Sequence, residues 1–173
     1  TDIEALQAEV RGETPEVAGP TVVGKRKKEG VIYTPDSITR FIVEKTLGGY
    51  LSEQFHELWE SFVDRRYKRG ERAGEWKNRK EEIAFWRAYQ EILCHLKVVD
   101  PACGSGAFLV AAFEFLHAEY TRVNSSLEDL SGLAYLFVLD NEILNQNLYG
   151  VDVNAESIEI TKLSLWLKTA RYG

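Results

Sequence analysis

The sequence contains no methionine among its 173 residues and has only two cysteines. Because a chain of this length ordinarily carries several methionines, we expect it to be a processed or excised piece of a longer polypeptide. Cys94 and Cys103 are too few for a disulfide framework and lack the paired spacing of metal ligands, so the sequence predicts neither disulfides nor a metal site. A reducing, cytoplasmic compartment is expected.

The sequence also lacks a long apolar run and an excess of basic residues. Its most apolar central stretch, residues 98–113, contains Asp100 and a Gly-Ser-Gly turn, whereas a membrane span needs about 18 consecutive apolar residues. The formal net charge of −6 excludes the basic field of a stand-alone nucleic-acid binder. With 45% apolar residues the chain can bury a core, so we expect a globular protein without a membrane segment, in which any DNA contact is local.

Two basic segments lie outside the expected core. Residues 1–30 begin with a short helical pattern, continue through glycines and prolines typical of a linker, and end in the basic run 25–28. We interpret that run as a solvated tether, with a DNA-phosphate contact as the alternative. The charged segment 64–82 is interpreted as the solvated tip of a helical hairpin, again with contact to the DNA backbone as the alternative.

Residues 31–97 carry a helical pattern. Thr34 is expected to cap a helix whose first residue is Pro35 and which ends at Gly48-Gly49. Its buried face should consist of Ile38, Phe41, Ile42 and Leu47. Two further helices are predicted over residues 51–62 and 83–93, both rich in aromatic residues.

The pattern changes at Lys97 to one typical of an α/β domain. A short strand over residues 97–100 leads through a glycine turn into a helix, a further helix is expected over 127–144, and a second strand covers 147–152. Strand, helix and strand in this order indicate a parallel sheet. Asn154 should cap the last helix, whose apolar residues predict burial on most sides. Because two strands cannot cover these helices, we expect the domain to continue beyond this piece.

The turn Gly104-Ser105-Gly106, between a strand ending in Asp100 and a helix, predicts a nucleotide-type site. Glycine lets the backbone approach a ligand, and the helix N-terminus supplies free N–H groups. No Lys-Ser/Thr follows the second glycine, so a Walker phosphate loop is excluded, and Leu109 occupies the third position of a G-x-G-x-x-G motif. Cys103 has no arginine within the next few residues to hold phosphate and is interpreted as a packing residue.

Asp152 ends the second strand and is the second candidate acid. A carboxylate there can accept hydrogen bonds from both ribose hydroxyls of an adenosine cofactor, or it can cap the following helix. It follows Gly106 by 46 positions, where a simple dinucleotide fold has about 20, so the interval must hold an extra helix.

Three motifs together resemble the adenine-N6 DNA methyltransferases: Tyr33-Thr34-Pro35, Asp100-Pro101-Ala102-Cys103-Gly104-Ser105-Gly106-Ala107-Phe108-Leu109, and Leu148-Tyr149-Gly150-Val151-Asp152. Their order is similar to the gamma class, and within it to the restriction-modification branch that fuses methyltransferase and nuclease. The resemblance implies an α/β, Rossmann-like S-adenosylmethionine-dependent methyltransferase core with a truncated parallel sheet, preceded by an α-helical segment. Residues 1–30 would be an N-terminal extension, 31–97 the helical segment, and 98–173 the first part of the cofactor-binding domain.

The resemblance also implies how S-adenosylmethionine would be bound. Asp100 would lie near its amino group, Asp152 would hold the ribose hydroxyls, and Val153 would pack near the adenine. Phe108 would pack under the turn or beside the cofactor. The implied cofactor-binding residues are Tyr33, Thr34, Pro35, Asp100, Pro101, Ala102, Cys103, Gly104, Ser105, Gly106, Phe108, Leu109, Asp152 and Val153.

The family's catalytic motif is absent from this chain. In the family an Asn-Pro-Pro-Tyr/Phe motif holds the flipped adenine, but none of the four prolines here follows an asparagine. We therefore expect no catalytic residue in this chain, no activity of this chain alone, and contact with double-stranded DNA mainly through other parts. The alternatives are the modification subunit of a multi-subunit restriction system, an RNA or protein methyltransferase, and a non-catalytic helical interaction module.

Overall fold

The computed structural model of the chain describes residues 34–62, 76, 78–132 and 139–170, which lie in one compact unit beginning at Thr34. Its elements are, in order, α3 (Asp36–Val43), η1 (Glu44–Gly48), α4 (Gly49–Phe62), α5 (Arg79–His95), β1 (Val98–Asp100), α6 (Ala107–Ser131), α7 (Leu139–Glu142), η3 (Ile143–Asn147), β2 (Leu148–Gly150) and α8 (Ala155–Thr169). The predicted extension 1–30, Tyr33 and most of the basic segment 64–82 lie outside the described residues.

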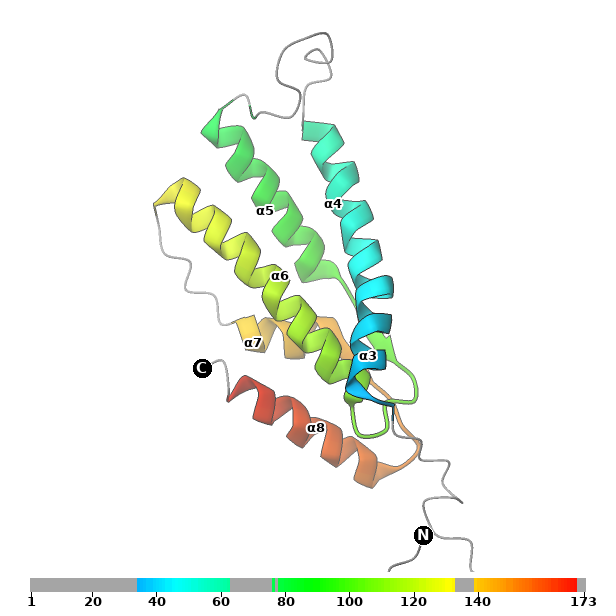
Figure 1. Cartoon of the computed structure of the whole chain (residues 1–173). Helices are drawn as coiled ribbons and strands as arrows, with labels where there is room; N and C mark the ends of the chain where they lie inside the picture. Colours follow the sequence, from blue (N-terminus) through cyan, green and yellow to red (C-terminus); the bar gives the residue numbers. More distant parts are fainter. Residues whose placement is uncertain (1–33, 63–75, 77, 133–138, 171–173) are drawn as a thin grey trace, which may run out of the picture. The chain divides into compact units, whose positions relative to one another are not determined.

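Residues 36–62 form one continuous helix. α3 passes through the π-helical turn η1 directly into α4, as Figure 1 shows. The predicted stop at Gly48-Gly49 is wrong because Gly49 keeps right-handed helical angles, φ −58° and ψ −52°. Gly48 instead allows close packing, since a Cβ atom there would lie 3.1 Å from the ring of Phe115 in α6. The N-cap is Pro35, with an extended ψ of 143°, and not the predicted Thr34.

The buried face of this helix differs from the prediction. It consists of every fourth residue, namely Thr39, Val43, Leu47 and Leu51. The prediction for Ile38, Phe41 and Ile42 is wrong, because their side chains are 38–57% exposed. A repeat of four exceeds the 3.6 residues of an α-helical turn, and the wider π-helical turn η1 compensates for the drift.

α5 packs against α4 through an aromatic cluster. Asn78 is the N-cap of α5, and its side chain accepts a hydrogen bond from the N–H of Glu81 at 3.0 Å. The fully buried Phe85 lies 4.9–5.8 Å, between ring centroids, from five aromatic residues: Phe55, Trp59, Phe62, Trp76 and Trp86. Such ring pairs each contribute about 0.5–1.5 kcal/mol beyond the area they bury. The cluster therefore stabilises the predicted helical hairpin far from the glycine turn.

α6 is the central helix of the described unit and contacts α3, α5, α8 and both strands. Its buried residues recur at helical spacing: Leu109, Ala111, Ala112, Phe113, Leu116, Tyr120, Val123 and Leu127. The helix ends only at Gly132, whose φ of +71° is left-handed. The bounds predicted for the further helix, 127–144, are wrong, because residues 127–131 belong to α6, whereas α7 and η3 at 139–147 supply the extra helical element before β2. No helix among the described residues is long and apolar enough to cross a bilayer.

The two predicted strands pair in parallel, which confirms the predicted strand pairing, and they form a small two-stranded sheet in a mostly helical unit. Val98 pairs with Leu148, and Asp100 pairs with Gly150, so both strands end at the same edge. Leu148 belongs to the core and Val98 packs against it, whereas Val99 and Tyr149 are exposed on the opposite face. The two candidate acids, Asp100 and Asp152, therefore lie at the same carboxyl edge of the sheet.

Asn147 is a fully buried polar residue at the junction of η3 and β2. Its Nδ2 donates to the carbonyls of Leu93 and Leu96, both at 2.8 Å, and its Oδ1 accepts from the Tyr120 hydroxyl at 3.1 Å. Burial raises the pKa of Tyr120, so the phenol remains a protonated donor. Asn147 therefore provides a hydrogen-bond donor for two backbone carbonyls at the end of α5, and it fixes the start of β2 against α6.

α8 packs on α6 through one face. Asn154 caps it as predicted, accepting hydrogen bonds from two backbone N–H groups of the first turn. The prediction of burial on most sides is wrong, because Leu163, Trp166 and Leu167 are more than half exposed. Among the described elements α6 makes the main contact with α8, and Thr161 is the buried residue of α8.

Replacing Asn147 with alanine should lower the free energy of unfolding by about 3 kcal/mol, because two carbonyls and a hydroxyl lose their partner. Urea denaturation followed by circular dichroism measures this change. Asn145→Ala, at an exposed position of the same turn, should change stability by less than about 0.5 kcal/mol. Equal losses in the two variants would contradict the role assigned to Asn147.

Candidate functional site

The glycine turn lies where β1 ends and α6 begins. Gly104 and Gly106 have left-handed φ values of +53° and +84°, which residues with side chains rarely adopt. The N–H of Cys103 donates to the Val151 carbonyl at 2.9 Å, and the N–H of Val151 donates to the Asp100 carbonyl at 2.9 Å. The hydrogen-bonding pattern of the sheet therefore continues into the turn and fixes it against the end of β2.

Glycine is required by close packing at two positions of the site. A Cβ atom would lie 2.8 Å from Cγ2 of Thr161 at Gly106, and 2.7 Å from Cδ1 of Leu109 at Gly150. Gly104 is different, because no described heavy atom lies within 4 Å of the corresponding position. A ligand can therefore reach the backbone at Gly104.

Asp152 connects β2 to the turn. Its Oδ2 accepts from the N–H of Gly104 at 2.9 Å, and its Oδ1 accepts from the N–H of Asn154 at 2.8 Å. These backbone hydrogen bonds, that from Asn154 first, lower the pKa of Asp152, so its carboxylate is ionised at neutral pH. A carboxylate has about four acceptor positions, so two remain for a ligand.

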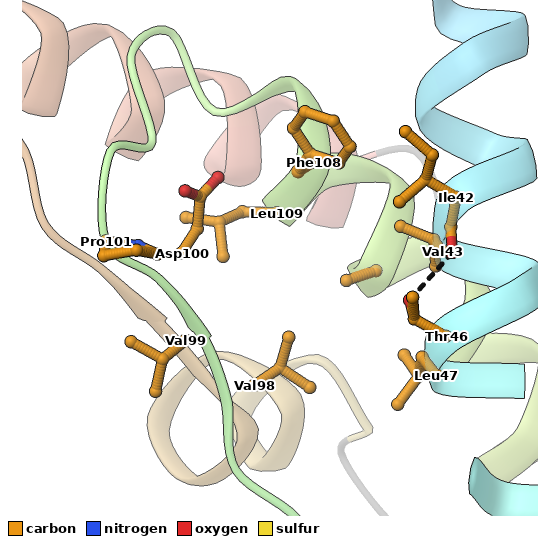
Figure 2. Close-up of a pocket in the computed structure, with 11 residues that line it drawn as sticks. Ile42, Val43, Thr46, Leu47, Val98, Val99, Asp100, Pro101, Phe108 and Leu109 are labelled. Carbon is orange, nitrogen blue, oxygen red and sulfur yellow. Dashed lines mark hydrogen bonds between the residues drawn. The ribbon is translucent and has the colours of Figure 1, made fainter. Parts of the chain in front are cut away.

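Asp100 has an oxygen that the described residues do not satisfy. Its Oδ1 accepts from the N–H of Ala102 at 3.1 Å, whereas Oδ2 is buried and has no hydrogen-bond partner among them. A cavity of about 320 Å³, lined mainly by apolar residues, lies between α3, β1 and α6 next to this side chain; Figure 2 shows Ile42 and Phe108 on its walls. An unpaired buried carboxylate oxygen is costly, so this position favours a donor or cation from a ligand.

The structure brings most of the predicted residues to one edge of the sheet. Pro101 and Phe108 line the cavity beside Asp100, Leu109 and Cys103 are buried beneath the turn, and Val153 is fully exposed. Thr34 and Pro35 precede α3, and a second pocket, about 270 Å³, is lined by both Asp36 and Ser105. The beginning of α3 therefore lies beside the turn.

The roles of two residues of this site do not follow from the sequence motifs. Thr161, only 5% exposed, donates from its hydroxyl to the Gly104 carbonyl at 2.8 Å. A lone threonine in the second turn of a helix gives no sequence signal for such a contact. Gly150 leaves room for the side chains of Leu109 and Cys103, which lie where its own side chain would be. A glycine within a strand, two residues before Asp152, is a sequence signal for such close packing. In the residues that the structure covers, no three potential metal ligands come together.

Comparison with known proteins identifies the domain that carries this site. Residues 73–172, more than half of the chain, match the MmeI DNA-methyltransferase domain. The chain belongs to this family. The match includes α5, the turn, both strands and α8, and it confirms the resemblance to DNA methyltransferases drawn from the motifs.

Three relatives of this chain are named as methyltransferases. It is 32% identical over 151 residues to a candidate type II restriction enzyme and methyltransferase of Methanocaldococcus jannaschii, covering 82% of this chain and 12% of that protein. It is 26% identical over 156 residues to the adenine-specific methyltransferase PglX of Lacticaseibacillus casei, which covers 81% of this chain and 11% of that protein. It is 33% identical over 72 residues to DNA methyltransferase A of Bacillus subtilis, which covers 42% of this chain and 8% of that protein. The chain thus spans between 8% and 12% of the length of these relatives.

Alanine should be tolerated differently at the two glycines of the turn. Gly104→Ala meets no neighbour and should cost about 1–2 kcal/mol for its left-handed φ alone. Gly106→Ala adds the clash with Thr161 and should cost about 3 kcal/mol or more. Adding Thr161→Ser, which removes the clashing methyl group, should recover part of that loss. Urea denaturation of the four chains tests this, and an equal cost at both glycines would contradict the packing described.

The hydrogen bonds to Asp152 should make stability depend on pH. Because they lower the pKa of Asp152 in the folded state, their contribution is fully present above the ordinary aspartate pKa and is lost as the pH falls from there through the lower folded-state pKa. The difference in unfolding free energy between the wild type and Asp152→Asn should therefore be largest near neutral pH and shrink toward pH values of about 3. Asp129→Asn, at an exposed position of α6 outside the site, is the control for the substitution itself.

Proposed function

We propose that this chain is the S-adenosylmethionine-binding part of a DNA adenine methyltransferase in a restriction-modification system. Residues 98–173 would form the first part of a Rossmann-like methyltransferase domain, and 31–97 the helical segment before it. The observation that carries the proposal is the arrangement at the sheet edge of a DNA-methyltransferase domain: an open Gly104 between an ionised Asp152 and an Asp100 with an unpaired buried oxygen.

The residues present fit S-adenosylmethionine group by group. Oδ2 of Asp100 suits the positively charged amino group, because that group would donate a hydrogen bond to this buried oxygen. The two remaining acceptor positions of Asp152 suit the ribose hydroxyls. The exposed Val153, one residue further on, suits the adenine ring. Ala102 to Gly106 would line the cofactor with backbone, and Tyr33, Thr34 and Pro35 would close its methionine end.

When bound, S-adenosylmethionine supplies an electrophilic methyl group. The part assigned to this chain is to bind and orient the cofactor, because Asp100 and Asp152 fix its two ends while the glycine turn lies between them. Activation of the acceptor amine requires groups that this chain lacks, since it has no Asn-Pro-Pro-Tyr motif. Adenine as the acceptor rests on the motif resemblance and on the name of PglX.

The names of the relatives bear on the choice among the alternatives. The Methanocaldococcus protein is named as both restriction enzyme and methyltransferase, which supports a fused enzyme over a separate modification subunit. Double-stranded DNA is accordingly the proposed substrate, bound mainly through parts outside these residues. We propose that the 173-residue chain alone does not methylate duplex DNA.

Calorimetric titration with S-adenosylmethionine tests the cofactor assignment. The wild-type chain should bind, and Asp100→Asn should raise the dissociation constant about tenfold or more, because a charge-assisted hydrogen bond contributes about 1.5–3 kcal/mol. Asp152→Ala should weaken binding as well, since it removes the proposed ribose acceptor. Asp129→Asn, an exposed carboxylate of α6, should bind as the wild type does.

Two results would contradict the proposal. An intact wild-type chain that does not bind S-adenosylmethionine would contradict the cofactor assignment. Unchanged affinity in both Asp100→Asn and Asp152→Ala would place the cofactor elsewhere.

A further inference from the structure

We propose that Thr161 of α8 is a positioning residue that sets the orientation of the Gly104–Ser105 peptide for ligand binding. The inference rests on the proposed function, because the ligand is the S-adenosylmethionine assigned to the turn. Thr161 lies 57 positions after Gly104 and outside all three motifs, yet its side chain makes its hydrogen bonds to the turn.

The Gly104 residue is held from both sides by two side chains. Its N–H donates to Oδ2 of Asp152 at 2.9 Å, and its carbonyl accepts from the Thr161 hydroxyl at 2.8 Å. The same hydroxyl also lies 4.0 Å from Sγ of Cys103, at the limit of a weak hydrogen bond. Glycine has more backbone freedom than any other residue type. These two hydrogen bonds therefore restrict the backbone of Gly104, as a side chain would do elsewhere.

The hydrogen bond from Thr161 also fixes the next N–H group. In a trans peptide the carbonyl and the N–H point in opposite directions. A Gly104 carbonyl directed toward Thr161 therefore turns the N–H of Ser105 away from α8. Gly104 faces open space, so a ligand can approach the backbone there and meet a preoriented donor.

The shape of Thr161 supports the same role. Its Cγ2 would lie 2.8 Å from a Cβ atom at Gly106, so its methyl group fills the space that the missing side chain leaves. Thr161 is the buried residue of α8, a helix in which Ile160, Leu163, Trp166 and Leu167 are exposed and Ile158 and Leu165 are partly buried. Its hydroxyl and its methyl group thus act on two different glycines of one turn, and only the hydroxyl is assigned to ligand binding.

Two substitutions in the full chain separate the hydroxyl from the methyl group. Thr161→Val keeps the branched shape and removes the donor, whereas Thr161→Ser keeps the donor and removes the methyl group. Calorimetric titration with S-adenosylmethionine should show a dissociation constant about tenfold higher for Thr161→Val, the effect of one lost hydrogen bond, and within about threefold of wild type for Thr161→Ser. Circular dichroism at the titration temperature establishes that each variant is folded.

Asn147→Ala is the control for loss of stability, because Asn147 bonds to α5 and α6 and not to the turn. Under conditions where it is folded, it should bind S-adenosylmethionine as the wild type does. Wild-type affinity in Thr161→Val, or an equal loss in Thr161→Ser, would overturn the role of the hydroxyl while leaving the proposed function intact. A wild-type chain that fails to bind would overturn both.

Discussion

The hydrogen bond between the Asp152 carboxylate and the Gly104 N–H joins positions 48 residues apart and closes the carboxyl edge of the sheet. It can form only because β1 and β2 are parallel and in register, with Asp100 opposite Gly150. Gly150 contributes as well, because a Cβ atom there would lie 2.7 Å from Cδ1 of Leu109 and 3.1 Å from Sγ of Cys103. The turn is therefore shaped by the second strand as much as by its own sequence.

The rest of the described unit supports this edge. α6 begins at the turn and supplies much of the core, and Asn147 anchors the start of β2 to α5 and α6 through three hydrogen bonds. Glu114 of α6 pairs with Arg40 of α3 and with Lys168 of α8, so the helices on either side of α6 are joined close to its N-terminus. The aromatic cluster around Phe85 stabilises the other end of the unit. A rigid turn between packed helices has little entropy to lose when a ligand binds.

The motifs and the strands could be predicted from the sequence because they depend on local residue types. The glycine turn, both strands and the Asn154 cap follow from short patterns, and the family match agrees with the resemblance that they carry. The helix face of α3 could not be predicted, because Ile38, Phe41 and Ile42 are more apolar than Thr39, which is buried. The π-helical turn η1, which keeps Leu47 and Leu51 on the same side as Val43, is not revealed by hydropathy either. The role of Thr161 could not be predicted either, because its hydroxyl contacts the turn 57 positions earlier in the chain, which depends on how α8 packs.

The central claim is that S-adenosylmethionine binds along the Asp100–Asp152 edge. An amide-resolved NMR titration of ¹⁵N-labelled chain with S-adenosylmethionine tests it most directly. We predict saturable shifts concentrated at Ala102, Gly104, Ser105 and Val153, with the amides around Phe85 unchanged. Saturable shifts confined to other residues, or no shifts in a folded chain, would contradict the account.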